Sequence, residues 1–157
     1  MPKSELKILK DGTKIWYLNG KFHREDGPAY EWVDGTKEWW FNGELHREDG
    51  PAVEWANGSK EWWLNGKRHR EDGPAIDWSN GDKAWFLNGK YHREDGPAYE
   101  GADGYKVWYL NGEKLTKEEF ELAMDIKRTK DKKRAILYRT SRIAKVCYEV
   151  MGIGGCD

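Results

Sequence analysis

The stretch NGSKEWWLNGKRHREDGPAIDW, residues 57–78, is one copy of a unit that recurs through most of this 157-residue chain. The period is 23 residues, and it is plainest in a glycine column and an asparagine column: Gly12, Gly35, Gly58, Gly81 and Gly104, and Asn19, Asn42, Asn65, Asn88 and Asn111. Residues 11–115 hold four complete copies and a fifth that breaks off after Gly112. A fixed period of this length is typical of repeat proteins, in which stacked units bury a common core.

Each copy is predicted to form β-structure. Asp34-Gly35 and Asn42-Gly43 are two-residue turn signals that accept a positive φ at both central residues, and they bracket the aromatic run Lys37–Phe41. This run is expected to be one strand between two hairpin turns. A second strand, Ala52–Ala56, follows Asp49-Gly50-Pro51, where proline removes a ladder donor and glycine relieves the backbone.

The period-two alternation of a strand assigns the aromatic side chains to two faces. One column is Trp in every copy, at Trp16, Trp39, Trp62, Trp85 and Trp108. The next position lies on the opposite face and varies among aromatics: Tyr17, Trp40, Trp63, Phe86 and Tyr109. On the returning strand Trp32, Trp55 and Trp78 share a face with Tyr30, Val53 and Ile76, and the charged residues Glu31, Glu54 and Asp77 lie opposite.

The composition supports a folded, aromatic core. Charged residues make up 35% of the chain, but the formal net charge is only -1, whereas disordered chains usually combine low hydrophobicity with a large net charge. Ten Trp, eight Tyr and four Phe supply the buried surface instead of aliphatic side chains. No apolar run approaches the roughly 20 residues of a membrane span, so no membrane association is expected.

The chain is expected to divide into a repeat domain, 1–115, a helical segment, 116–151, and a flexible tail, 152–157, with Gly152 as helix C-cap. Charge is divided as well. Residues 1–115 hold 17 basic and 21 acidic side chains, whereas residues 127–145 hold nine basic and one acidic. The near-zero total is therefore a cancellation between a mildly acidic sheet and a basic helix.

The helical segment begins with a capping box, in which Thr116 is the N-cap and Glu119 is at N3. Neither glycine nor proline occurs from Thr116 to Met151, and apolar residues recur there at three- and four-residue spacing. We expect a break near Lys130, with Thr129 or Asp131 capping a second helix.

The 23-residue period, the NGxxH turn and the later Asp-Gly or Asn-Gly turn resemble MORN repeats, and more closely the MORN-variant repeats of bacterial and tailed-phage proteins, some of them called antitoxins. The resemblance covers residues 11–115. It implies a mainly β fold: an elongated single-layer antiparallel sheet of stacked 23-residue hairpin repeats, here followed by a C-terminal α-helical segment. It also implies a scaffold or a binding surface, and it carries over no catalytic residue. The chain departs from the usual pattern by having HREDGPA where that family has a shorter HGxG segment.

The most suggestive polar group is His-Arg-Glu-Asp, which begins at His23, His46, His69 and His92. A His beside two carboxylates suits acid–base chemistry, and a column of His suits a metal. We favour a structural role, because the group occurs four times whereas an active site needs one asymmetric pocket. The arginines are then expected to pair with Glu or Asp and the histidines to bond to the backbone, with no metal site and no cofactor.

The variable aromatic column is the candidate contact surface, because a one-layer sheet leaves a large apolar patch on the face that its helix does not cover. The arginines near it are of a type that stacks on bases or grips phosphates. The candidate binding residues are Trp40, Trp63, Phe86, His46, Arg47, His69, Arg70 and Arg93. A second candidate surface is the basic helix, with Lys132, Lys133, Arg134, Arg139 and Arg142, which could contact nucleic acid.

These observations favour a non-enzymatic protein that binds a partner protein, which by the resemblance would be a host defence factor or a toxin that binding neutralises. The alternative is a small-molecule sponge for a nucleotide or signalling molecule. Nucleic-acid binding through residues 127–145 comes third, and a homodimer through the C-terminal helix stays open. Two cysteines, Cys147 and Cys156, are too few for a disulfide scaffold, and MPKSELKILKDG at the N-terminus has no apolar stretch. A cytoplasmic location is therefore expected, in the host if the chain is phage-encoded.

Overall fold

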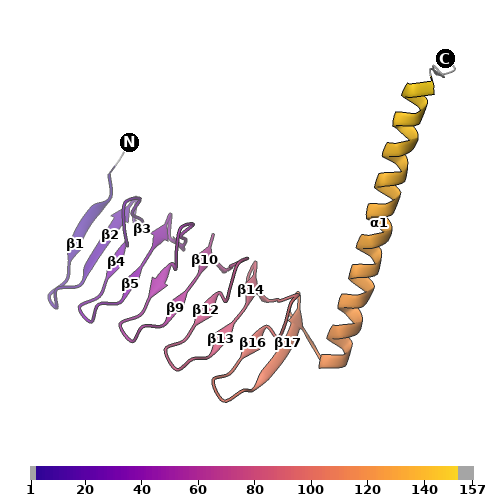
Figure 1. Cartoon of the computed structure of the whole chain (residues 1–157). Helices are drawn as coiled ribbons and strands as arrows, with labels where there is room; N and C mark the ends of the chain where they lie inside the picture. The colour runs from indigo at the N-terminus through magenta and orange to yellow at the C-terminus, as the bar shows by residue number, and fades with distance from the viewer. Residues whose placement is uncertain (1–2, 152–157) are drawn as a thin grey trace. The chain divides into compact units, whose positions relative to one another are not determined.

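The computed structural model describes the backbone of residues 3–151 and the side chains of residues 3–140, and it is mainly β with one C-terminal helix (Figure 1). The chain separates into two compact units, a sheet unit, Met1–Thr116, and a helical unit that begins at Lys117.

The sheet unit is built on one long antiparallel sheet whose strands follow one another in hairpin order (Figure 1). Along this sheet lie β1 (Glu5–Ile8), β2 (Lys14–Leu18), β4 (Tyr30–Glu31), β5 (Lys37–Glu38), β8 (Val53–Glu54), β9 (Lys60–Glu61), β12 (Ile76–Asp77), β13 (Lys83–Ala84), β16 (Tyr99–Glu100), β17 (Lys106–Leu110) and β18 (Glu113–Leu115). β3 (Lys21–Phe22) pairs with β2. The expected antiparallel hairpin sheet is confirmed.

Each middle repeat also carries a short two-stranded hairpin. These pairs are β6 (Trp40–Phe41) with β7 (Glu44–Leu45), β10 (Trp63–Leu64) with β11 (Lys67–Arg68), and β14 (Phe86–Leu87) with β15 (Lys90–Tyr91). Backbone bonds join each of them to the repeat before it, as from the Gly43 amide to the Phe22 carbonyl, 2.9 Å. Two sets of backbone hydrogen bonds therefore connect neighbouring repeats, one within the long sheet and one between successive short hairpins.

The run 37–41, predicted to be one strand, is divided at Trp39. The Trp39 amide donates to the Ala52 carbonyl at 2.8 Å, whereas its own carbonyl accepts from the His46 amide at 3.0 Å. The chain therefore changes hydrogen-bonding partners at this residue, which places β5 in the long sheet and β6 in the short hairpin. In the terminal repeats the corresponding strands, β2 and β17, stay continuous.

The two turns of a repeat differ from each other. Asn42 and Gly43 have φ of 52° and 85°, so the Asn-Gly turn has the predicted positive φ at both central residues. The Asp-Gly turn does not: only Gly35 has a positive φ, 94°. Its amide bonds to the Trp32 carbonyl at 3.1 Å, which makes a type I turn followed by a left-handed glycine. Asp34 instead caps the turn, since its Oδ1 accepts from the Thr36 amide at 2.8 Å.

Small side chains form the tightest part of the core. The alanine that follows each Gly-Pro is fully buried, at Ala29, Ala52, Ala75 and Ala98. In two of the turns a hydroxyl also bonds to the next turn: Thr36 Oγ1 accepts from the Ala56 amide at 3.1 Å, and Ser59 Oγ accepts from the Ser79 amide at 2.9 Å. Close approach of the repeats is thus accompanied by satisfied polar groups.

The helical unit contains α1 (Lys117–Met151), one unbroken helix that begins directly after Thr116. The predicted break near Lys130 and the second helix are wrong. Thr129 does not cap a new helix, because its Oγ1 bonds back to the Asp125 carbonyl at 2.8 Å inside the same helix. The predicted C-cap Gly152 and the tail 152–157 lie outside the described residues.

Candidate functional site

One face of the long sheet is a ladder of alternating charges. The strand register places lysines and acids opposite each other in one row: Lys14, Glu31, Lys37, Glu54, Lys60, Asp77, Lys83, Glu100 and Lys106. Opposite charges in facing positions of a sheet attract each other. This row is called the charged face from here on, and two of its lysines form ion pairs within it, Lys14 with Glu31 and Lys83 with Asp77.

The all-Trp column lies beside this row, and each of four tryptophans is covered by an arginine. The guanidinium carbon lies 3.9–4.1 Å from the ring centroid in the pairs Arg24 on Trp16, Arg47 on Trp39, Arg70 on Trp62 and Arg93 on Trp85. This distance is typical of a cation–π contact. The stacks recur once per repeat.

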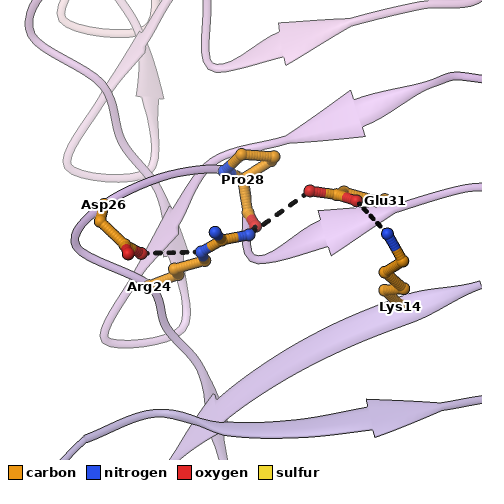
Figure 2. A network of polar contacts seen from close by, with 5 residues as sticks. All are labelled: Lys14, Arg24, Asp26, Pro28 and Glu31. Carbon is orange, nitrogen blue, oxygen red and sulfur yellow. Dashed lines mark hydrogen bonds and ion pairs between the residues drawn. The ribbon is translucent and has the colours of Figure 1, made fainter.

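The same arginines are also bound by their own turns. Figure 2 shows Arg24, whose Nε donates to Asp26 at 2.8 Å and whose Nη1 donates to the Pro28 carbonyl at 3.2 Å and to Glu31 at 3.4 Å; Lys14 reaches the same Glu31 at 3.3 Å. The Arg24 hydrogen bond and its charge hold the pKa of Asp26 below its ordinary value. The expected pairing of Arg with Glu or Asp is therefore confirmed.

The predicted association of these arginines with the variable aromatic column is wrong. Arg47 covers Trp39 and bonds to Asp49 and to the Pro51 carbonyl, whereas Trp40 packs against Phe22 of the preceding repeat. Arg70 and Arg93 repeat the arrangement of Arg47. These arginines follow the Asn-Gly turn. The alternation of side chains along the strand before the turn therefore does not predict the face on which they lie. One face of each guanidinium is therefore covered by a tryptophan, and its Nε is bonded to an aspartate.

The histidines hold neighbouring repeats together. The Nδ1 of each accepts from the backbone amide of the asparagine 19 residues later, in the pairs His23 and Asn42, His46 and Asn65, His69 and Asn88, and His92 and Asn111, at 3.0–3.2 Å. This confirms the expected bond to the backbone. Among the described residues no three His, Cys, Asp or Glu side chains are grouped so as to hold a metal ion.

The opposite face of the sheet is aromatic. Its rings contact one another within and between repeats: Tyr17 with Phe22, Phe22 with Trp40, Phe86 with Tyr91, and Tyr91 with Tyr109, with centroids 4.1–5.4 Å apart. Tyr30 stacks on Trp32 at 4.5 Å, which confirms that these two residues share a face, and Tyr30 also contacts Phe22 at 5.7 Å. We call the surface formed by Trp32, Trp40, Trp55, Trp63 and their neighbours the aromatic face.

Exposure along the aromatic face is uneven. Trp32 and Trp55 are 43% and 44% exposed, whereas Trp40 and Trp63 are half-buried. Phe86, predicted to be a contact residue, is 5% exposed and belongs to a core cluster with Ala75, Ile76 and Ala84. The two exposed indoles of the aromatic face therefore lie at the ends of the first and second copies, whereas Phe86 of the fourth copy is buried.

Two glutamates lie within this surface, and the sequence reasoning missed them. Glu38 accepts from the indole Nε1 of Trp32 at 3.2 Å and of Trp40 at 2.7 Å. Glu61 accepts from Trp55 at 3.3 Å and Trp63 at 3.0 Å. The other repeats have Ile15, Ala84 and Val107 at this position. The available signal was a charged residue at a position that alternation assigns to the aromatic side.

The basic helix is exposed along its described length, since every side chain from 125 to 140 is exposed. This range includes the predicted contact residues Lys132, Lys133, Arg134 and Arg139; the side chain of Arg142 lies outside the described residues. No helix in the described part of the chain is long and apolar enough to cross a membrane.

The chain matches no protein-family model and no curated protein. The class defined by the fold is thus a protein of β-hairpin repeats with a C-terminal helix, and function has to be argued from the two faces of its sheet.

Proposed function

We propose that this chain is a non-enzymatic binding protein whose aromatic face contacts a partner protein. The observation that carries the proposal is the exposure of Trp32 and Trp55 on a surface of further tryptophans. Tryptophan is enriched among the residues that dominate binding energy, and contiguous exposed apolar patches mark interaction sites. The charged face is the poorer candidate, because its four stacked arginines and two of its lysines, Lys14 and Lys83, are already paired with acidic side chains of the chain.

The resemblance to repeats of bacterial and tailed-phage proteins supports a narrower form of this proposal. In that form the partner is a host defence factor or a toxin, and binding neutralises it in the cytoplasm. The small number of cysteines fits a reducing compartment.

The test is capture of the partner from a lysate of the source cell with a matched pair of variants, one on each face. Trp55→Ala removes the exposed ring of the aromatic face, whereas Lys60→Ala removes a side chain of the charged face in the adjacent strand. A discrete protein retained by wild type and by Lys60→Ala, but lost with Trp55→Ala, supports the proposal. Retention by Trp55→Ala together with loss in Lys60→Ala contradicts it.

Exposure of the basic helix supports a second candidate function, the binding of nucleic acid through residues 127–145. Contacts of lysine and arginine with phosphates release counterions, so affinity falls steeply as salt rises. Fluorescence anisotropy with a labelled single-stranded oligonucleotide should show this salt dependence, and the chain truncated after Thr116 should not bind. Binding that is unchanged by the truncation would rule this candidate out.

A further inference from the structure

In the third repeat the aromatic face includes an arginine side chain, that of Arg68. Arg68 Nε donates to Glu61 Oε2 at 3.2 Å, and its Cζ lies 4.8 Å from the centroid of the Trp63 ring and 5.7 Å from that of Phe86. The Glu61 side chain is only 12% exposed. A carboxylate and two ring faces thus form a slot, and the cation in it is supplied by the opposite strand of the short hairpin.

The second repeat has the same carboxylate and the same indoles without the cation. Leu45 faces Trp40 in the register in which Arg68 faces Trp63. A leucine side chain ends at Cδ, so it cannot supply the Nε and the guanidinium that Arg68 places against Glu61 and Trp63. Glu38 takes part in no ion pair among the described residues, whereas Glu61 is paired with Arg68.

The hydrogen bonds of the two carboxylates differ in the same way. Glu61 Oε2 accepts two bonds, from Trp63 and from Arg68. Glu38 Oε2 accepts one, from Trp40. A carboxylate oxygen has two acceptor positions. Oε2 of Glu38 therefore has a second acceptor position available, which on Glu61 is occupied by the Arg68 guanidinium. Leaving a half-buried anion without a counter-charge is unfavourable, and a cation that arrives from outside would remove that penalty.

We propose that Glu38 and Trp40 form a binding slot for an arginine side chain of the partner protein, beside Trp32, whose indole donates to the same carboxylate. The slot would hold the guanidinium as the third repeat holds Arg68, with a charge-assisted bond to Glu38 and its plane on the Trp40 ring. This inference rests on the proposed function, since it names the chemical group of the partner that the aromatic face recognises.

The slot can be tested without the partner, because the chain offers its own positive control. Leu45→Arg should fill the slot from within and raise the midpoint of thermal unfolding by about 2 °C, as expected for a cation–π contact and a charge-assisted bond. The gain should disappear in the background of Glu38→Gln. An equal gain with and without Glu38 would overturn the proposal, since the added arginine would then be stabilising the sheet by other means.

The second arm is a titration with N-acetyl-arginine methylamide, observed through the ¹⁵N–¹H resonances of the tryptophan indoles. The resonances of Trp32 and Trp40, assigned with Trp32→Phe and Trp40→Phe, should shift saturably in wild type. They should not shift in Glu38→Gln or in Leu45→Arg, whereas Glu31→Gln on the charged face should respond like wild type. N-acetyl-norleucine methylamide, which lacks the charge, should produce no shift. Absence of a shift in wild type, or the same shift in Glu38→Gln, would contradict the slot.

Capture of the partner separates this inference from the proposed function. If Trp55→Ala loses the partner but Glu38→Gln retains it at wild-type level, the aromatic face binds a protein and the arginine slot is wrong. If the indoles respond to the arginine amide while capture does not depend on the aromatic face, the slot exists and the proposed function is wrong.

Discussion

At the scale of single residues, the Arg–Asp pairs make stability depend on pH. In each copy an arginine lowers the pKa of an aspartate carboxyl, and its hydrogen bond is the largest cause. The aspartates are Asp26, Asp49, Asp72 and Asp95. The folded chain keeps these carboxylates ionised at a pH where the unfolded chain, with its ordinary value of 3.8, takes up protons. The stabilisation is therefore complete above that value and is lost as the pH falls through the lower folded pKa.

The prediction is that Asp49→Asn loses less stability on acidification than wild type does. The free energy of unfolding is measured by urea titration at about pH 6 and about pH 3, and the difference between the two should be smaller in the variant. Glu44→Gln is the control, because Glu44 makes no ion pair among the described residues. An equal loss in Asp49→Asn and wild type would show that the pair does not contribute to the pH dependence.

The turn asparagines give a second prediction at this scale. Asn65 has a φ of 49° and donates its amide to His46 Nδ1 at 3.2 Å. Asn65→Gly and Asn65→Ala both lose the side chain, but only alanine is strained at positive φ. Alanine should therefore be about 1 kcal/mol less stable than glycine at this position, as measured by urea unfolding. Equal stability of the two variants would mean that the turn relaxes out of the left-handed region.

At the scale of the elements, the sequence predicted the hairpin sheet and the distribution of the aromatic columns over its two faces. It could do so because a 23-residue period and alternation along a strand are local signals. The division of residues 37–41 at Trp39 was not predictable in this way. It depends on which neighbouring strand the Trp39 amide and carbonyl bond to, and that choice is made between segments far apart in the sequence.

Other wrong predictions also depend on contacts that alternation and spacing along the chain do not specify. Thr129 was a plausible cap for a second helix, but a threonine can equally bond back to the carbonyl four residues earlier, as it does here. Arg47 was assigned to the wrong face because a tight turn separates it from Trp39 and Trp40. Glu38 is not predicted because glutamate occupies this column in only two of the five copies, so the column has no periodic signal of its own.

At the scale of the whole molecule, each repeat is fixed mainly by its neighbours, so stability should be close to additive along the sheet unit. Deletion of residues 58–80 removes one full period and lets Glu54 take Lys83 as its partner in the charged row. This variant should unfold cooperatively at a lower temperature than wild type and keep the near-ultraviolet circular dichroism of packed tryptophans. Deletion of residues 58–69 breaks the phase and should abolish that signal. Similar behaviour of the two deletions would contradict the repeat-by-repeat account.

Two faces with different chemistry are the feature of the sheet unit on which the proposed function depends. The charged face satisfies itself through alternating Lys and acid residues and through Arg–Trp stacks, whereas the aromatic face leaves two large indoles exposed and one carboxylate without a cation. An elongated contact with a partner is expected on the second face, spread over the repeats that contain Trp32 and Trp55.

Site-specific photo-crosslinking in the source cell tests this most directly. A photoreactive benzoylphenylalanine is placed at Trp55 on the aromatic face or at Lys60 on the charged face, and the protein is recovered after irradiation. The account predicts a discrete crosslinked protein from the position of Trp55 and none from that of Lys60. A crosslink from Lys60 with none from Trp55 would show that the partner binds the charged face and would contradict the central claim.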